Sequence, residues 1–211
     1  MENLKCKQTS QFSKIWENFR FSSADDFSNF VYFFIAEKKM VKIGLQIKAN
    51  LEFVTGLIPD EIEDFHWHLK LKCTQCGEIP NHWQYVTLAE EQALKGGRGS
   101  ANYVSKCKLC SHQNSLDIKQ DSITSYDFKD CNKFKTIVVF DCRGLEPVDF
   151  EPRNGWKAQG YKENEDGEGE VTSTIFNDVD LSDKEWADYD EKSEESTVIS
   201  EFEVNFVVVK D

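Results

Sequence analysis

Four cysteines in two pairs are the residues of this sequence best suited to chemistry. Each pair has the spacing Cys-x-x-Cys, and 30 residues separate Cys73 and Cys76 from Cys107 and Cys110. A Cys-x-x-Cys turn directs two thiolates toward one point, and two such turns complete a tetrahedral shell of four sulfur atoms. Zinc suits this shell because it accepts thiolates and has no redox chemistry that would oxidise them. The spacing therefore predicts one Zn²⁺ per chain.

The composition of this shell indicates a structural metal site. All four predicted ligands are cysteine, which leaves no position open for water or a substrate. Two alternatives remain: reduced thiol clusters without metal, and a redox dithiol, which normally needs one pair at a helix N-terminus in a βαβ unit. No Ser-His-Asp order, carboxylate pair or dinucleotide-binding motif stands out. The chain is therefore expected not to be an enzyme.

Residues beside the cysteines support zinc binding. Gly77 directly follows the second cysteine, where a residue without a side chain lets the backbone turn toward the sulfur atoms. Lys72, Lys106 and Lys108 adjoin predicted ligands. We expect these cations to offset the charge of about −2 that four thiolates leave around Zn²⁺.

Other metal-ligating residues are weaker candidates. His66 and His68 lie two apart and would share one strand face, where they would suit a second metal, but surface or hydrogen-bonded histidines are the simpler expectation. Cys131 and Cys142 are expected to be buried or idle thiols, with a transient share in a soft metal as the alternative for Cys142. Cys6 is expected to be incidental.

A glycine-rich segment at residues 94–100 looks at first like a phosphate-binding loop. It lacks the Gly-Lys-Ser/Thr ending of such a loop, and no strand-to-helix pattern surrounds it. We expect a turn that brings the second cysteine pair back to the first. Anion binding by Arg98 is the alternative.

Alternating apolar and polar residues predict the strands that position these cysteines. The predicted strands cover residues 41–51, 65–73, 116–118, 137–140 and 198–208. Helical patterns are few: the best are residues 87–95 and a short turn opened by Ser182, with Glu185 at the capping-box spacing. The fold is therefore predicted to be mainly β with few short helices.

The chain changes in texture at residue 40. Residues 1–39 are rich in Phe, Ser and Asn without a sustained period, whereas strand alternation begins at once after Met40. We interpret residues 1–39 as an N-terminal extension, either disordered or the product of an alternative start. Residues 40–211 then form the zinc-binding β domain.

A weak internal repeat suggests two related β-sheet lobes. Phe65 stands eight residues before Cys73, and Phe134 stands eight residues before Cys142. Lobe one would cover residues 40–125 and carry the zinc-binding cysteine pairs, and lobe two would cover residues 126–211. Lobe two is acidic, and its segment 162–170 predicts an exposed loop.

Charge excludes broad nucleic-acid binding. The formal net charge is −13, and from Glu146 onward 20 acidic residues face only 6 basic ones, so this part of the chain repels phosphate. The remaining possibility is single-stranded RNA stacking on Trp67, Trp83 and Tyr85. The acidic region is instead expected either to attract a basic protein partner or to be a solvated face without one.

The sequence offers no sign of a membrane or secretory protein. No apolar run approaches the roughly 18 residues of a membrane-spanning helix, and the best, residues 30–36, lies too far from the start for a signal peptide. The reducing cytosol is the expected compartment, where cysteines bind metals or stay reduced. A mitochondrial leader is the alternative, although acidic residues among the first 39 count against it.

Several motifs together resemble the eukaryotic CXXC motif-containing zinc-binding protein family. They are residues 40–49 (MVKIGLQIKA), 72–78 (KCTQCGE), 93–101 (ALKGGRGSA), 106–110 (KCKLC), 142–150 (CRGLEPVDF) and 186–192 (WADYDEK). The resemblance covers residue 40 to the C-terminus. It implies two related β lobes with zinc held by Cys73, Cys76, Cys107 and Cys110.

The resemblance also bears on activity and partners. No enzymatic activity is established for the family, and a link to copper handling through the copper chaperone of superoxide dismutase has been suggested for relatives. The chain is therefore expected to be a monomeric binding or adaptor module with a structural zinc site and a protein partner. A thiol-based metal relay or redox protein in copper or zinc handling is the alternative.

Overall fold

The computed structural model describes residues 40–94, 99–163 and 169–210. The predicted N-terminal extension, residues 1–39, lies outside the described residues, as do Arg98 and residues 164–168 of the predicted acidic loop. Within the described part of the chain, no helix is long and apolar enough to cross a membrane.

Antiparallel strands make up most of the described chain, so the prediction of a mainly β fold is confirmed. The strands are β1 (Val41–Glu52), β2 (Val54–Pro59), β3 (Trp67–Cys73), β4 (Gln84–Val86), β5 (Gln92–Ala93), β6 (Ser100–Ala101), β7 (Tyr103–Lys106), β8 (Gln113–Lys119), β9 (Lys135–Arg143), β10 (Leu145–Glu151), β11 (Trp156–Glu163), β12 (Gly169–Val179), β13 (Trp186–Asp190) and β14 (Glu195–Val209). The helical elements of the described residues are two 3-10 turns, η1 (Gln120–Ser122) and η2 (Phe128–Asp130).

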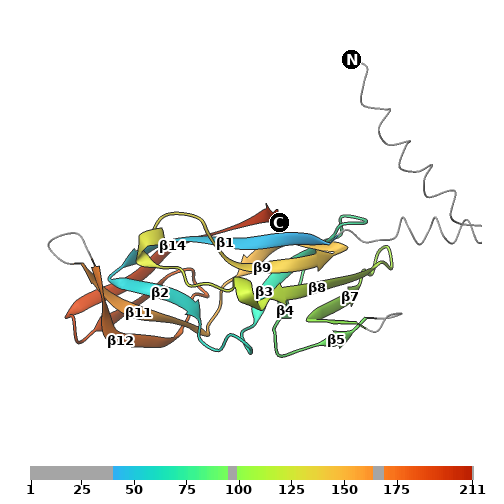
Figure 1. Ribbon diagram of the computed structural model, residues 1–211. Coiled ribbons are helices and arrows are strands. Elements are labelled where there is room, and N and C mark those ends of the chain that lie inside the picture. The colour runs from blue at the N-terminus through green and yellow to red at the C-terminus, as the bar shows by residue number, and fades with distance from the viewer. Residues whose placement is uncertain (1–39, 95–98, 164–168, 211) are drawn as a thin grey trace, which may run out of the picture. The chain divides into compact units, whose positions relative to one another are not determined.

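The strands form one large and three small antiparallel sheets. The large sheet has the order β13-β14-β1-β9-β8-β7, and the small ones have the orders β10-β3-β4, β12-β11-β2 and β5-β6. In Figure 1, β1 and β9 run along the upper side of the fold, with β2, β11 and β12 below them at one end and β3, β4, β7 and β8 at the other. The large sheet, which includes β7 and β8, thus links the sheet β12-β11-β2 at one end to the sheet β10-β3-β4 at the other (Figure 1).

The two related lobes are not confirmed by this topology. β1 pairs with β14 on one side and with β9 on the other, and β3 pairs with β10. Each pairing joins a strand before residue 125 to one after it. Strands from both halves of the sequence therefore lie side by side in the large sheet and in the sheet β10-β3-β4, whose strand β3 ends at Cys73.

A cluster of aromatic rings forms the centre of the core. Trp67 and Trp156 are fully buried, and Phe65 packs edge-to-face against both at centroid distances of 4.8 and 4.9 Å. Phe140 and Phe150 extend the cluster. The alternation that predicted β3 thus places its apolar face inside, and the suggestion that Trp67 is a stacking platform for RNA is wrong because its ring has no exposed surface.

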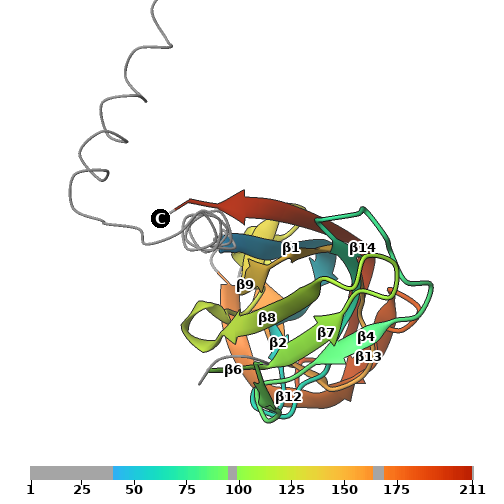
Figure 2. The same ribbon diagram turned by 90° about the vertical axis from the view of Figure 1, so that its right-hand side faces the viewer.

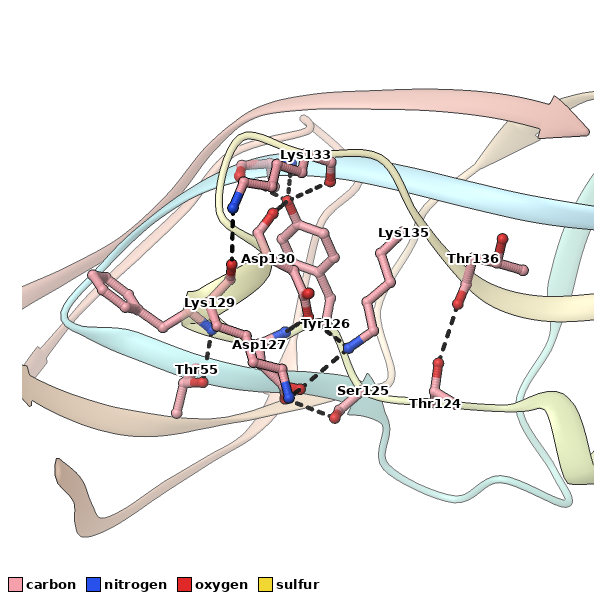
Figure 3. Close-up of polar contacts among 12 residues, drawn as sticks. Thr55, Thr124, Ser125, Tyr126, Asp127, Lys129, Asp130, Lys133, Lys135 and Thr136 are labelled. Carbon is pink, nitrogen blue, oxygen red and sulfur yellow. Dashed lines mark hydrogen bonds and ion pairs between the residues drawn. The ribbon is translucent and has the colours of Figure 1, made fainter. Parts of the chain in front are cut away.

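Tyr126 fixes the connection between β8 and β9 (Figure 3). Its buried hydroxyl lies 2.7 Å from the carbonyl oxygen of Asp130 and 3.0 Å from that of Lys133, and it accepts a hydrogen bond from the backbone N–H of Ala49 on β1. Lys135 Nζ bridges the carboxylates of Asp127 and Asp130 at 3.2 and 2.5 Å. This connection is therefore held by polar contacts to β1 as well as by packing.

The predicted helix over residues 87–95 is wrong. Thr87 Oγ1 and the backbone N–H of Ala89 both donate to the carbonyl oxygen of Glu63, and the Asn102 side chain donates to carbonyl oxygens in the same segment. Backbone groups that a helix would use are thus bonded to other parts of the chain. The segment is instead a loop that leads into β5.

The predicted turn at Ser182 exists without a helix. Asp180 Oδ1 accepts hydrogen bonds from both the backbone N–H and the hydroxyl of Ser182, at 2.9 and 2.6 Å. The capping box of the described structure lies in η2, between Asp127 and Asp130. Spacing alone identified the turn at Ser182 but not the acceptor that stabilises it.

Candidate metal centre

The structure brings the four predicted cysteines together at one end of the sheets. Cys73 is the last residue of β3 and Cys107 directly follows β7, and each begins a short turn that carries the second cysteine of its pair. The four Sγ atoms all lie within 4.8 Å of one another. Figure 2 faces this end of the molecule, with β4, β7 and β8 toward the viewer.

The sulfur positions fit a tetrahedral metal ion. Cys73 Sγ and Cys110 Sγ are 3.7 Å apart, and Cys76 Sγ and Cys107 Sγ are 3.5 Å apart. Zinc–sulfur bonds of about 2.3 Å give a sulfur–sulfur distance of about 3.8 Å in a regular tetrahedron. The donor set and its spacing therefore suit Zn²⁺, and no disulfide joins these cysteines.

The two cysteine turns, residues 73–78 and 107–112, have the same backbone pattern. In each, the N–H of the fifth residue donates to the carbonyl oxygen of the first, and the N–H of the first donates to the carbonyl oxygen of the sixth. The bonds are Gly77 N to Cys73 O (2.8 Å), Cys73 N to Glu78 O (2.9 Å), Ser111 N to Cys107 O (2.9 Å) and Cys107 N to His112 O (2.8 Å). Gly77 and Ser111 both have positive φ, of 79° and 60°. The prediction that Gly77 permits the turn is confirmed.

Exposure and ionisation differ among the four thiols. Cys73 is buried and Cys107 is half-buried, whereas Cys76 and Cys110 are exposed. Burial raises the pKa of Cys73, but hydrogen bonds from the backbone of Cys76 and of Gln75 outweigh it and lower the pKa to about 6. A thiolate is therefore readily available on β3, and a bound dication would favour the thiolate at the other three positions.

Glu78 is a neighbour of the cluster that sequence reasoning missed. Its carboxylate oxygen Oε2 accepts hydrogen bonds from Cys107 Sγ (2.9 Å) and from the backbone N–H of Leu109 (3.1 Å). A backbone hydrogen bond from Cys110 lowers the pKa of Cys107, but the bond to Glu78 and burial raise it to about 12. The signal in the sequence was a carboxylate two residues after Cys76, whose position across the cluster depends on the fold.

The second half of the chain supports the first cysteine turn. The carbonyl oxygen of Gly144 accepts a hydrogen bond from Thr74 N at 3.1 Å, and Gly144 has a φ of 76° that favours glycine. Leu145, the next residue, pairs with Cys73 across β10 and β3. The motif at residues 142–150 therefore contacts the metal centre although it contributes no sulfur to it.

The three predicted lysines divide into two kinds. Lys72 is not free to offset the thiolates because its Nζ lies 2.7 Å from Glu146 Oε1. Lys106 and Lys108 are exposed and make no ion pair with any of the described residues. Their role in balancing the charge of the centre stays a prediction.

His66, His68, Cys131 and Cys142 lie outside the cluster, and Cys6 lies outside the described residues. The rings of His66 and His68 are 6.0 Å apart, and His66 stacks on Tyr85 at 4.5 Å. Burial lowers the pKa of His68 to about 4. Cys142 is buried, and burial raises its pKa to about 12. Cys131 accepts a hydrogen bond from the backbone N–H of Leu51 at 3.3 Å.

A metal site needs at least three His, Cys, Asp or Glu side chains close together. Among the described residues, only the four cysteines meet this condition. The alternative of a second metal on His66 and His68 therefore finds no third ligand in the described structure.

The glycine-rich segment is flanked by a short hairpin. β5 and β6 pair on either side of it, and Leu94 N donates to Gly99 O at 2.9 Å. Its central residues, 95–98, lie outside the described residues. The flanking strands return the chain toward β7 and the second cysteine turn, in agreement with the predicted turn.

Comparison with known proteins identifies relatives across most of this chain. Residues 44–207 match the family described as CXXC motif containing zinc binding protein, eukaryotic. The CXXC motif containing zinc binding proteins of Bos taurus and Homo sapiens are 53% and 51% identical to the chain over 168 residues, which is 80% of this chain and 99% of each relative.

Solved structures agree with these matches. The crystal structure of C1orf123 has a TM-score of 0.71 and 51% identity, and the match covers 80% of this chain and 99% of that one. A hypothetical protein from Plasmodium falciparum has a TM-score of 0.65 at 24% identity, over 79% of this chain and 99% of that one. The second likeness concerns the fold alone.

Proposed function

Because the chain belongs to the eukaryotic family of CXXC motif containing zinc binding proteins, we propose that Cys73, Cys76, Cys107 and Cys110 hold one structural Zn²⁺ per chain. The observation that carries this proposal is the convergence of four Sγ atoms within 4.8 Å from two separate turns. Four thiolate ligands leave no open coordination position, which is typical of structural zinc sites.

The proposed zinc joins two segments that lie in different sheets. One cysteine turn follows β3, in the sheet β10-β3-β4, and the other joins β7 to β8, at the edge of the large sheet. Three of the four cysteines are at least partly exposed, so burial of apolar groups contributes little at the turns themselves. Structural zinc sites contribute about 10–16 kcal/mol, enough to fix two such turns to each other.

We further propose that the zinc-stabilised fold works as a binding module without catalytic activity. The support is the closed thiolate shell together with the absence of a recognisable catalytic constellation in the sequence. The proposed partner is a protein, bound by a monomeric chain. The excess of acidic residues after Glu146 would favour a basic surface on that partner.

The second candidate function is a thiol-based relay for zinc or copper. One observation favours it: Cys76 and Cys110 are exposed, so a competing ligand can approach two of the four sulfur atoms. A relay must release its metal on the timescale of transfer, whereas a structural site retains it. The exchange rate therefore distinguishes the two functions.

Native mass spectrometry of the purified full chain, with and without a zinc chelator, tests both. The binding-module function predicts one zinc per chain, slow loss to the chelator, and no disulfide under mild oxidant. The relay predicts rapid loss of zinc, or uptake of Cu⁺ in its place. Affinity capture with the wild type and with Cys73→Ser then shows whether a partner requires the zinc-bound fold.

A further inference from the structure

A cavity of about 430 Å³ opens beside the cysteine turns. Its lining comes from the end of β3, the start of β10, the loop before β4 with Gln84, β7 with the start of β8, and the cysteine turns themselves. Two proposed zinc ligands, Cys73 and Cys107, belong to it. Leu71 and Leu145 line it and are only 4% and 3% exposed, so they form its floor. Pro80 and the half-buried Tyr103 add to this apolar surface. The volume suits one small organic group.

Two lysines and a histidine line this cavity on its exposed side. Lys106, Lys108 and His82 line it and are exposed, and neither lysine has an ion-pair partner among the described residues. The lysines of neighbouring β3 differ, because Lys70 and Lys72 are paired with Asp149 and Glu146. In a chain of net charge −13, two unpaired lysines at a concave site attract an anion.

The polar groups inside the cavity leave one acceptor unused. Glu78 is the one carboxylate among the described lining residues, and it already accepts hydrogen bonds from Cys107 Sγ and Leu109 N. Gln84 also lines the cavity, and its Oε1 is buried without a hydrogen-bond partner. A buried acceptor in this state costs free energy until a donor reaches it. This oxygen has almost no exposed surface, so a ligand in the open cavity does not reach it and the ligand needs no matching donor.

We propose that this cavity binds an apolar carboxylate. The hydrocarbon part would pack on Leu71 and Leu145, and the carboxylate would pair with Lys106 and Lys108. The C-terminal residue of a polypeptide has this chemistry, and so does a free N-acylated amino acid. The inference rests on the proposed function, since it assigns a ligand class to the binding module.

A competing explanation assigns both lysines to the metal centre alone. Lys106 and Lys108 flank Cys107 in sequence, so their charges would then serve only to balance the thiolates. In that case a carboxylate would gain no affinity from its charge. The two explanations therefore differ in one measurable respect, the preference of the cavity for an acid over its neutral amide.

Titration of the ¹⁵N-labelled, zinc-loaded full chain by NMR separates these explanations. The probes are N-acetyl-leucine, N-acetyl-leucinamide and a short peptide that ends in a free leucine carboxylate. We expect the acid to shift backbone amides of residues 78–84 and 103–108, and the amide to bind about ten-fold more weakly. A peptide that binds about ten-fold more tightly than the free acid identifies a polypeptide C-terminus as the source, and equal affinity identifies the free acid.

A double variant and its control locate the charge effect. Lys106→Gln with Lys108→Gln is expected to weaken acid binding about ten-fold. Lys133→Gln with Lys162→Gln removes the same charge from exposed lysines outside the cavity lining and is expected to leave it unchanged. Equal binding of acid and amide, or no shift of cavity amides up to about 10 mM acid, overturns the proposal.

Zinc measured on the same samples keeps the two proposals distinct. A chain that holds one zinc and ignores the acid refutes the cavity proposal alone. A folded chain without zinc refutes the proposed function, and the acid titration of that sample still tests the cavity.

Discussion

The cysteine turns and the turn between β13 and β14 hold strand ends together by different means. The second, residues 190–194, is closed by Asp190, whose fully buried carboxylate accepts hydrogen bonds from Thr174 Oγ1 (2.6 Å), Thr172 Oγ1 (3.0 Å) and the backbone N–H of Lys192 (3.0 Å). Burial raises the pKa of Asp190, but these bonds outweigh it and lower the pKa to about 2. The Asp190 turn is therefore complete in the polypeptide itself.

Each cysteine turn is closed by its own backbone hydrogen bonds, but these bonds do not join the two turns to each other. Their sulfur atoms lie close together, yet Cys76 and Cys110 are exposed and the nearest carboxylate, Glu78, would repel a thiolate at Cys107. Thiolates packed this closely repel one another unless a cation lies between them. The difference indicates that one region depends on a metal and the other on a buried charge, so each should fail under its own treatment.

The largest expected effect comes from Cys107→Ser. We expect this variant to lose its zinc and to lose hydrogen-exchange protection in both cysteine turns, because zinc sites of this kind contribute about 10–16 kcal/mol. The Asp190 turn should keep its protection, since it shares no ligand with the centre. Mass-spectrometric hydrogen exchange measures both regions in one sample.

Cys131→Ser is the matched control for that experiment. Cys131 is a half-buried thiol outside the cluster, and a serine hydroxyl can still accept the hydrogen bond from Leu51 N. The Cys131→Ser variant should retain its zinc and its hydrogen-exchange protection in both cysteine turns. A Cys107→Ser variant that stays protected at residues 73–78 without metal would contradict the dependence on zinc.

The next effect in size is that of Asp190→Ala. Removing a carboxylate that accepts three hydrogen bonds should lower the free energy of unfolding by about 1.5–3 kcal/mol, while zinc content stays at the wild-type level. Denaturant titration with parallel metal analysis measures both quantities. Asp188→Ala, at an exposed position of β13, is the control and should change little. Loss of zinc from Asp190→Ala would show that the two regions are coupled.

Acid should weaken the Asp190 turn in a defined range of pH. The folded-state pKa, about 2, lies below the ordinary value of 3.8, so ionised Asp190 contributes stability that is fully present above about pH 4 and is lost as pH falls toward 2. The difference in stability between wild type and Asp190→Asn should therefore shrink below pH 4. Carbon-13 NMR of the side-chain carboxyl tests the cause directly, and titration of Asp190 near pH 4 would refute it.

The smallest effects compare the two cysteine turns with each other. Gly77→Ala places a side chain at a φ of 79° with no atom within 4 Å of the new Cβ, so the cost should be backbone strain alone, about 1 kcal/mol. Ser111→Gly removes similar strain at a φ of 60° and should stabilise the second turn. Because glycine also gives the unfolded chain more freedom, this gain in stability should be smaller than the loss caused by Gly77→Ala. Competition with a coloured zinc chelator measures both. Equivalent turns predict that Gly77→Ala lowers the zinc affinity and Ser111→Gly raises it. A change in the same direction for both variants would argue against equivalent turns.

The sequence predicted those features that depend on local pattern. Alternation identified β1, β3 and β14 because each buries one face, and the Cys-x-x-Cys spacing predicted the convergence of four sulfur atoms. The role of Gly77 followed from its place after Cys76. In each case the signal is a pattern of a few residues, even where, as for the two cysteine pairs, the residues it brings together are far apart in sequence.

Features that depend on distant partners were missed. β12 exposes apolar Val171 and Ile175, so its alternation carries little signal of a buried face. Residues 87–95 have helical periodicity, but Glu63 and Asn102 compete for their backbone groups. The pairing of β1 with β9 and β14, which mixes the two expected lobes, depends on contacts between residues 88 or more positions apart.

The most direct test of the central claim is X-ray absorption spectroscopy at the zinc edge on the purified full chain. The account predicts a single shell of four sulfur atoms at about 2.3 Å. A shell with fewer than four sulfurs, or one that includes an oxygen or nitrogen ligand, would contradict a closed structural site.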